Sequence, residues 1–173
     1  MYFKYYSFFM AIANTGLMTR DIALKSYSVN QHYLKCLLKK KLIIHKGNFI
    51  LYGKVTNIYS LSNNTKNYIR NLGKAPYKSN ISQLEHDYLL LKTYSSLPEY
   101  IQKTWLNETE LKALYNGITV DGVFLLNHNL IGVEIITPNY TKNTILEKKQ
   151  FGHTHCKDLI VMNTNDISIK ERR

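Results

Sequence analysis

The stretch SVNQHYLKCLLKKKLI, residues 28–43, decides how the first half of the chain folds. Leu34 and Leu37 recur at helix spacing, and three consecutive lysines run into a Leu-Ile pair at the end of the stretch. Ser28 followed three residues later by Gln31 matches a capping box, so Ser28 is predicted to be the N-cap. The stretch therefore predicts an amphipathic helix with a basic exposed side, and its neighbours decide whether that side meets DNA.

The flanking segments predict helices before this stretch and a β-hairpin after it. Apolar spacing predicts a helix over residues 3–13, and Thr19 is the expected N-cap of a second helix over 19–25. Two β-rich runs follow, with turns expected at residues 46–48 and 53–54, and a last helix begins after Ser62. Helices followed by a hairpin and a closing helix are typical of a winged helix-turn-helix.

The net charge lies entirely in this first part of the chain. Residues 1–79 hold 13 Lys and Arg against one acid, a formal +12, whereas residues 80–173 hold 10 against 11, a formal −1. This asymmetry indicates a polyanion partner for the first part. Two distant cysteines and the lack of an apolar run of about 18 residues favour a cytoplasmic, nucleoid-associated protein that does not enter a membrane.

If the leucines of the basic helix face the core, its polar residues near the N-terminus lie where recognition helices meet base edges. Asn and Gln can pair with adenine, and lysines and arginine reach phosphates. The candidate residues for double-stranded DNA are Arg20, Ser28, Asn30, Gln31, His32, Lys35, Lys39, Lys40, Lys46 and Lys54, with Lys41 beside them. The alternative is a solvated basic helix in a domain that contacts only protein.

A short polar segment, residues 74–80, separates residues 1–73 from a second predicted domain over residues 81–165, and residues 166–173 are expected to be a flexible basic tail. The second domain is predicted as α-β-(α)-β-β-α-β, with a helix from residue 81 and a strand over residues 100–106. The chain as a whole is thus predicted to be α+β. GHTHCKD, residues 152–158, is expected to be a loop, and its histidines and cysteine are not expected to bind zinc.

Acids stand at three informative places in the second domain: Glu85 on its first helix, and Asp121 and Glu134 within apolar strands. A lone acid in an apolar strand is costly unless it is paired or binds a metal. Two carboxylates on adjacent antiparallel strands can converge on Mg²⁺. The arrangement resembles the PD-(D/E)XK nuclease fold, whose lysine would fall at Ile136 in this chain.

Without that lysine the fold is expected to have lost its chemistry, unless Lys148 or Lys149 on the next helix substitutes. The site residues of this vestigial or alternative nuclease are Glu85, Asp121, Glu134, Lys148 and Lys149. No cofactor and no metal are expected, with Mg²⁺ implied only if the nuclease is active.

GLMTRDIALKSYSVNQHYLKCLLKKKLI and YSLSNNTKNYIRNLG resemble the winged-helix repressor pattern. LEHDYLLLKTY, DGVFLLN, GVEI and LEKKQF, placed after a basic winged helix, resemble the replication-relaxation family of plasmids and mobile elements. Val120 and Ile136 depart from that family's motifs, where it has a proline and an acid. The resemblance implies a winged helix joined to a nuclease-like domain that assists plasmid mobilisation, replication or its control.

These observations predict a sequence-specific DNA-binding protein of a mobile element, either a transcriptional regulator or a mobilisation or replication accessory factor. Its second domain is expected to be a degenerate nuclease that serves a homodimer or contacts a relaxase or a replication protein. The alternative is a metal-dependent DNA endonuclease that its winged helix delivers to the target.

Overall fold

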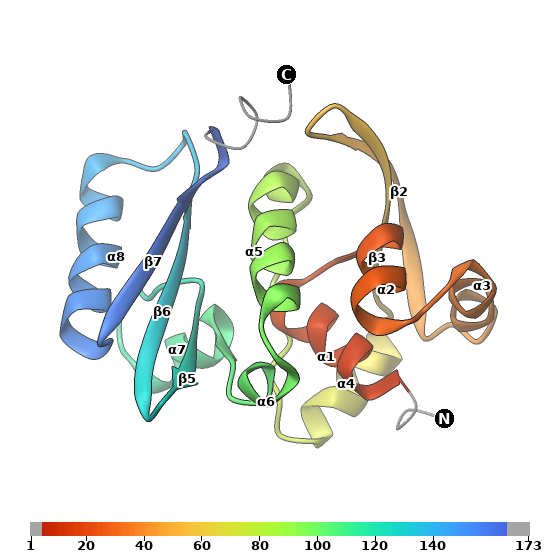
Figure 1. Cartoon of the computed structure of the whole chain (residues 1–173), viewed down its shortest axis with the longest axis horizontal. Coiled ribbons are helices and arrows are strands. Elements are labelled where there is room, and N and C mark those ends of the chain that lie inside the picture. The colour runs from red at the N-terminus through yellow and green to blue at the C-terminus, as the bar shows by residue number, and fades with distance from the viewer. Residues whose placement is uncertain (1–4, 166–173) are drawn as a thin grey trace. The chain divides into compact units, whose positions relative to one another are not determined.

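The computed structural model describes residues 5–165, apart from the side chain of Ile81, and confirms an α+β chain (Figure 1). It divides into two compact units, Met1–Ser96 and Leu97–Arg173. The predicted tail over residues 166–173 lies outside the described residues.

The boundary between the units lies later in the chain than the segment 74–80 that the composition suggested. The amide of Tyr77 donates to the carbonyl of Ala13 at 2.7 Å, and the hydroxyls of Tyr27 and Ser95 lie 3.0 Å apart. These bonds fasten the supposed linker and the helix after it to the first unit. Local composition could not reveal them, since they join residues distant in sequence.

The first unit alternates helices with a small sheet. Its elements are α1 (Tyr6–Thr15), β1 (Met18–Thr19), α2 (Arg20–Tyr27), α3 (Gln31–Lys39), β2 (Ile43–Leu51), β3 (Lys54–Leu61), α4 (Asn63–Asn71), the 3₁₀ turn η2 (Ile81–Gln83) and α5 (Leu84–Ser96). The sheet has the order β1-β3-β2 and is antiparallel throughout. The predicted N-caps Thr19 and Ser62 are confirmed, because their side chains accept from the amides of Ile22 and Thr65.

The hairpin of β2 and β3 is longer than the sequence suggested. The strand β2 runs on through Gly47 with a bulge between His45 and Gly47, so the turn predicted at residues 46–48 is wrong. The chain reverses at Tyr52 and Gly53, both at positive φ, where Leu51 pairs with Lys54. A bulge that contains glycine has the same local sequence features as a turn, so the sequence pattern did not distinguish the two.

The helix α3 begins at a different residue from the one predicted. Ser28 ends α2 in the left-handed conformation at φ 55°, so its prediction as the N-cap of α3 is wrong. Asn30 is the N-cap: its backbone is extended and its side chain accepts from the amide of Tyr33 at 3.1 Å. Two residues of capping type, Ser28 and Asn30, lie two positions apart here, and only the one next to the first helical residue can reach the free amides.

Lys41 follows the end of α3 and adopts the left-handed conformation, at φ 55°. Glycine is the usual residue at this position of a helix end. Its amide donates to the carbonyl of Leu38 at 2.9 Å, and the amide of Leu42 donates to that of Leu37 at 3.0 Å. This pair of bonds is the Schellman closure of a helix end. A lysine therefore stands at a position where a side chain is strained.

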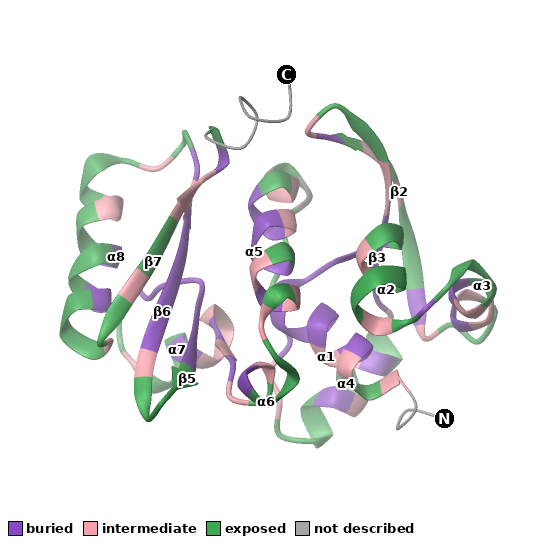
Figure 2. Ribbon diagram, viewed as in Figure 1, coloured by how far each residue is buried: buried purple, intermediate pink, exposed green. Residues whose placement is uncertain are grey.

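The core of the first unit forms where the helices cover the sheet. Leu34 and Leu37 are buried, as the helix pattern predicted, while most of the outer side of α3 is exposed (Figure 2). The largest buried side chains of this unit are Tyr94, Phe8, Ile12, Leu17, Met18, Leu34, Leu37, Ile43, Ile58, Leu61 and Ile69. This burial fixes which side of α3 is left for a partner.

Among the described residues, the second unit contains a four-stranded sheet and the helices α6, α7 and α8. Its elements are α6 (Glu99–Gln102), β4 (Leu106–Asn107), α7 (Glu108–Leu114), β5 (Gly122–Leu126), β6 (Asn129–Ile136), α8 (Lys142–His155) and β7 (Asp158–Asn163). The strand order is β4-β5-β6-β7; β4, β5 and β6 are antiparallel, and β7 returns through α8 to lie parallel to β6. One face of the sheet carries the core cluster of Leu111, Val120, Val123 and Phe151.

Two predictions for this unit are wrong. Residues 99–102 form α6 and only Leu106–Asn107 form a strand, so the strand expected over residues 100–106 is mostly absent. His153 and His155 lie in the last turn of α8 instead of a loop. In both places tertiary packing selects a conformation that the local pattern leaves open.

No helix among residues 5–165 is both long enough and apolar enough to cross a membrane.

Candidate functional site

The outer side of α3 is a polar and basic strip. Gln31, His32, Lys35 and Lys39 are exposed on it, opposite the buried leucines. The hydrophobic pattern thus places these four predicted residues on one accessible surface. Asn30 is exposed at the start of the helix, where its side-chain oxygen already accepts a hydrogen bond as the N-cap.

The start of α4 lies against the end of α3. The hydroxyl of Thr65 donates to the carbonyl of Leu42 at 2.7 Å, and the amide of Ser62 donates to the same carbonyl at 3.1 Å. Since Leu42 directly follows Lys41, this contact brings the first turn of α4 next to the lysines that close α3.

A second group of cations lies on α4 and the hairpin. Burial lowers the pKa of Lys66, and the positive charges of Lys46 and Arg70 lower it further. Lys66 is therefore close enough to Lys46 of β2 and to Arg70 of α4 to be repelled by both. Lys66 and Arg70 were not predicted from the sequence, because only the fold brings α4 beside the hairpin.

The remaining predicted DNA residues of the first unit are exposed at separate places. Arg20 starts α2 and pairs with Asp21 at 3.8 Å, Lys40 caps the end of α3, and Lys54 starts β3. Ser28 is exposed between α2 and α3.

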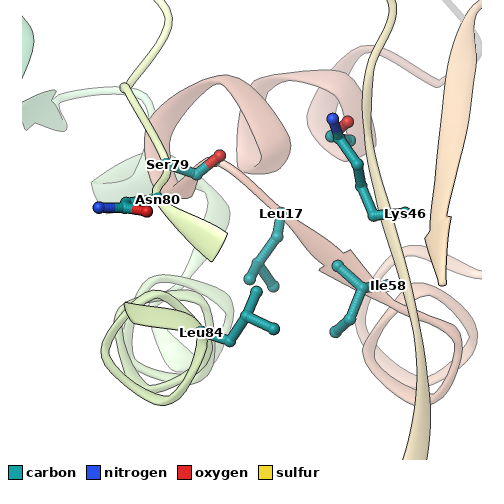
Figure 3. A pocket seen from close by; sticks show the side chains of 8 residues that line it. Leu17, Lys46, Ile58, Ser79, Asn80 and Leu84 are labelled. Carbon is teal, nitrogen blue, oxygen red and sulfur yellow. The ribbon is translucent and has the colours of Figure 1, made fainter. Parts of the chain in front are cut away.

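A small cavity of about 80 Å³ lies within the first unit. Leu17, Ile58 and Leu84 point into it from three directions, and Lys46, Ser79 and Asn80 line it with them (Figure 3). The hydroxyl of Ser60, which also lines the cavity, has no hydrogen-bond partner among the described residues. The cavity has room for a few atoms and is not a site for a nucleotide.

The second unit contains a buried cluster of opposite charges. The ammonium of Lys148 lies 2.8 Å and 3.0 Å from the two carboxylate oxygens of Glu134, and 3.5 Å from Oδ1 of Asp121. It also lies 3.9 Å from Oε1 of Glu108. The side chains of Lys148, Asp121 and Glu134 are 7%, 2% and 2% exposed.

The hairpin of β5 and β6 positions the two central acids. Gly122 pairs with Val133, so Asp121 and Glu134 come next to each other on the face of the sheet that α8 covers. The amide of Asp121 donates to Oε2 of Glu134 at 3.2 Å, and Oδ2 of Asp121 accepts from the amide of Ile135 at 2.7 Å. The prediction that the two carboxylates converge is confirmed, although Asp121 immediately precedes β5 instead of lying within it.

Electrostatics keep Lys148 charged. Burial alone would lower its pKa, but Asp121 and Glu134 outweigh burial and raise the pKa above the ordinary value for lysine. The ammonium also lies 5.3 Å from the ring centre of Tyr140. Burial, together with Asp121 and Glu134, raises the pKa of Tyr140, which holds this phenol neutral.

Sequence reasoning named Lys148 as a substitute for the missing lysine but did not find Glu108 or Tyr140. Glu108 starts α7 and pairs with Lys112 at 2.9 Å as well as facing Lys148. Neither residue interrupts an apolar strand, so neither carries the signal that identified Asp121 and Glu134.

The other candidate residues do not enter this cluster. Glu85 is exposed on α5, which belongs to the first unit, and Lys149 is exposed on α8. Ile136 is half-buried at the end of β6. Of the five predicted nuclease residues, the structure brings together three: Asp121, Glu134 and Lys148.

A PD-(D/E)XK site would hold Mg²⁺ between carboxylates, and the residues as arranged do not fit a metal. Mg²⁺ requires oxygen ligands at about 2.1 Å and keeps several waters, whereas an ammonium already contacts both oxygens of Glu134. Among residues 5–165, no three histidine, cysteine, aspartate or glutamate side chains are grouped as metal ligands.

Comparison of the chain with protein-family models, curated proteins and solved structures found no match.

Proposed function

We propose that this protein binds double-stranded DNA through its first unit, as a transcriptional regulator or a mobilisation or replication accessory factor of a mobile element. The observation that carries the proposal is the outer side of α3, which is exposed, polar at its N-terminal end and basic at its C-terminal end. Recognition helices present base-reading side chains near their N-terminus and leave phosphates to flanking cations.

The arrangement around α3 supports the same function. Two helices precede it, a β-hairpin and a fourth helix follow it, and the short strand β1 completes the sheet. This order is typical of winged helix-turn-helix domains. The cations Lys46, Lys66 and Arg70 add positive charge on the hairpin and the helix that follow α3.

The residues take different roles in this proposal. Gln31 reads base edges, since its amide can both donate and accept. Lys39 and Lys46 neutralise phosphates, which supplies affinity without sequence information. The second unit serves dimerisation or partner contact, and the protein acts in the bacterial cytoplasm, associated with the nucleoid.

A selection of bound duplexes from a random pool, followed by binding measurements on the selected site and on an unrelated duplex, tests the proposal. Gln31→Ala should weaken binding to the selected site by about 1–3 kcal/mol and leave binding to the unrelated duplex nearly unchanged. Lys46→Ala should weaken both alike.

Two residues of α8 provide matched controls, since Gln150 and Lys149 are exposed on the second unit. Gln150→Ala and Lys149→Ala should leave both affinities unchanged. If Gln31→Ala and Lys46→Ala behave identically, α3 is not the element that reads the sequence.

A second candidate is a metal-dependent endonuclease, and one observation favours it. Lys148 lies within hydrogen-bonding distance of Glu134, where a migrated catalytic lysine would have to be. The site is, however, buried instead of lying in an open groove. Incubation of supercoiled DNA with the protein and Mg²⁺ or Mn²⁺ tests it: cleavage by the wild type that Asp121→Asn abolishes would place this candidate first.

A further inference from the structure

The position of Lys148 has a consequence for the second unit that is independent of DNA binding. The ammonium contacts both oxygens of Glu134 and faces Asp121 and Glu108, so three carboxylates surround one cation. In a nuclease-like site those carboxylates would surround a metal ion.

We infer that Lys148 is an internal cation that occupies the position of a metal ion, so that the carboxylate cluster of the wild-type protein binds no divalent metal. The cluster then serves to fasten α8 to the hairpin of β5 and β6.

The contacts already engage the carboxylate oxygens that a second cation would need. Both oxygens of Glu134 lie within 3.0 Å of the ammonium, and Oδ2 of Asp121 is held by the amide of Ile135 at 2.7 Å. A divalent ion bound to the same oxygens would lie a few ångströms from the ammonium and be repelled by it in a medium of low dielectric constant.

Charge balance points the same way. Glu108 is neutralised by Lys112 at 2.9 Å, and Asp121 and Glu134 share Lys148. Removing the ammonium would leave two carboxylates side by side, which is the arrangement that binds a hydrated divalent ion. Burial of these side chains also denies a hydrated ion access to the wild-type cluster.

The test is the number of Mn²⁺ ions bound per full-length chain, measured by equilibrium dialysis, for five proteins. The wild type and Asp121→Asn should bind the same background amount. Lys148→Ala should bind one ion more than the wild type, and the double variant Lys148→Ala/Asp121→Asn should return to the background. Lys149→Ala, the matched control on the same helix, should behave as the wild type.

Binding of one Mn²⁺ by the wild type that Asp121→Asn abolishes would overturn the inference, and so would a folded Lys148→Ala that gains no ion. If Lys148→Ala is unfolded without metal, the fluorescence of Trp105, the one tryptophan of the chain, reports its refolding. Trp105 lies against Gly122, next to Asp121. Refolding on addition of Mn²⁺ supports the inference, and failure to refold contradicts it.

Discussion

The two units hold their charges in opposite ways. Residues 1–96 contain 14 Lys and Arg and three acids, and the lysines of α3 are exposed. Residues 97–173 contain nine of each, and the second unit buries Lys148 among carboxylates. Cations exposed on a surface can bind a polyanion, whereas a buried paired cation interacts only with its partners inside the protein. The comparison supports our proposal that the first unit binds DNA, and it gives the charges of the second unit a structural role.

The largest expected effect tests whether the buried charges of the second unit stabilise its fold. Lys148→Ala should lower the free energy of unfolding of the second unit by about 3–5 kcal/mol, because it leaves buried carboxylates without their cation. Lys149→Ala should leave it nearly unchanged, since that side chain is exposed. Urea titration followed by Trp105 fluorescence measures both free energies. Equal effects of the two variants would contradict a structural role for the buried Lys148.

A half-buried phenol in the first unit provides a test at alkaline pH. Burial raises the pKa of Tyr27 from 10.0 to about 12, partly offset by the hydrogen bond with Ser95. Since folding raises this pKa, the contribution of Tyr27 to the free energy of unfolding is fully present below pH 10. This contribution is lost as the pH rises towards 12, by up to about 2 kcal/mol. Urea unfolding followed by circular dichroism should show this loss in the wild type. Tyr27→Phe should reduce the loss; an identical loss would mean that Tyr27 does not cause it.

Substitutions at Asn30 separate a structural role in α3 from base contact. Asn30→Ala should destabilise the first unit by about 1 kcal/mol, because it removes the N-cap. Asn30→Ser keeps a capping oxygen and should retain the stability while losing the amide. Thermal unfolding by circular dichroism measures the first effect and binding to the selected duplex the second. If Asn30→Ser binds that duplex as the wild type does, Asn30 acts only as a cap.

The smallest expected effect concerns Lys41, which is strained at φ 55°. Lys41→Gly should stabilise the first unit by a few tenths of a kcal/mol to about 1 kcal/mol, because glycine adopts this conformation without strain. It should also weaken DNA binding slightly through the lost charge. Lys39→Gly, inside the helix, should instead destabilise by about 1 kcal/mol. Stabilisation with unchanged DNA affinity would show that Lys41 does not contact phosphate.

Sequence patterns predicted the features that depend on neighbouring residues. Helix spacing identified the buried Leu34 and Leu37, and residue type identified Thr19 and Ser62 as N-caps. The acids Asp121 and Glu134 were identified because each stands in an apolar run that a sheet would bury. Burial then required a partner, which the structure supplies as Lys148.

Features that depend on distant residues were missed or misplaced. The bonds that attach the segment around Tyr77 and α5 to the first unit moved the boundary from residues 74–80 to Ser96. Glu108 of the charge cluster, and Lys66 and Arg70 beside Lys46, were missed for the same reason: contacts between residues distant in sequence bring them there. The winged helix-turn-helix, the nuclease-like fold and the kinship with replication-relaxation proteins stay predictions.

Salt dependence of binding between the full-length protein and duplex DNA tests the central claim most directly. If cations of α3, the hairpin and α4 contact six or more phosphates, the affinity should fall at least about a thousandfold between 50 and 200 mM salt. Lys46→Ala should reduce the slope of log K against log salt by about 1, and Lys149→Ala should leave it unchanged. An affinity that does not change with salt, or a slope that Lys149→Ala reduces as much as Lys46→Ala does, would contradict DNA binding through the first unit.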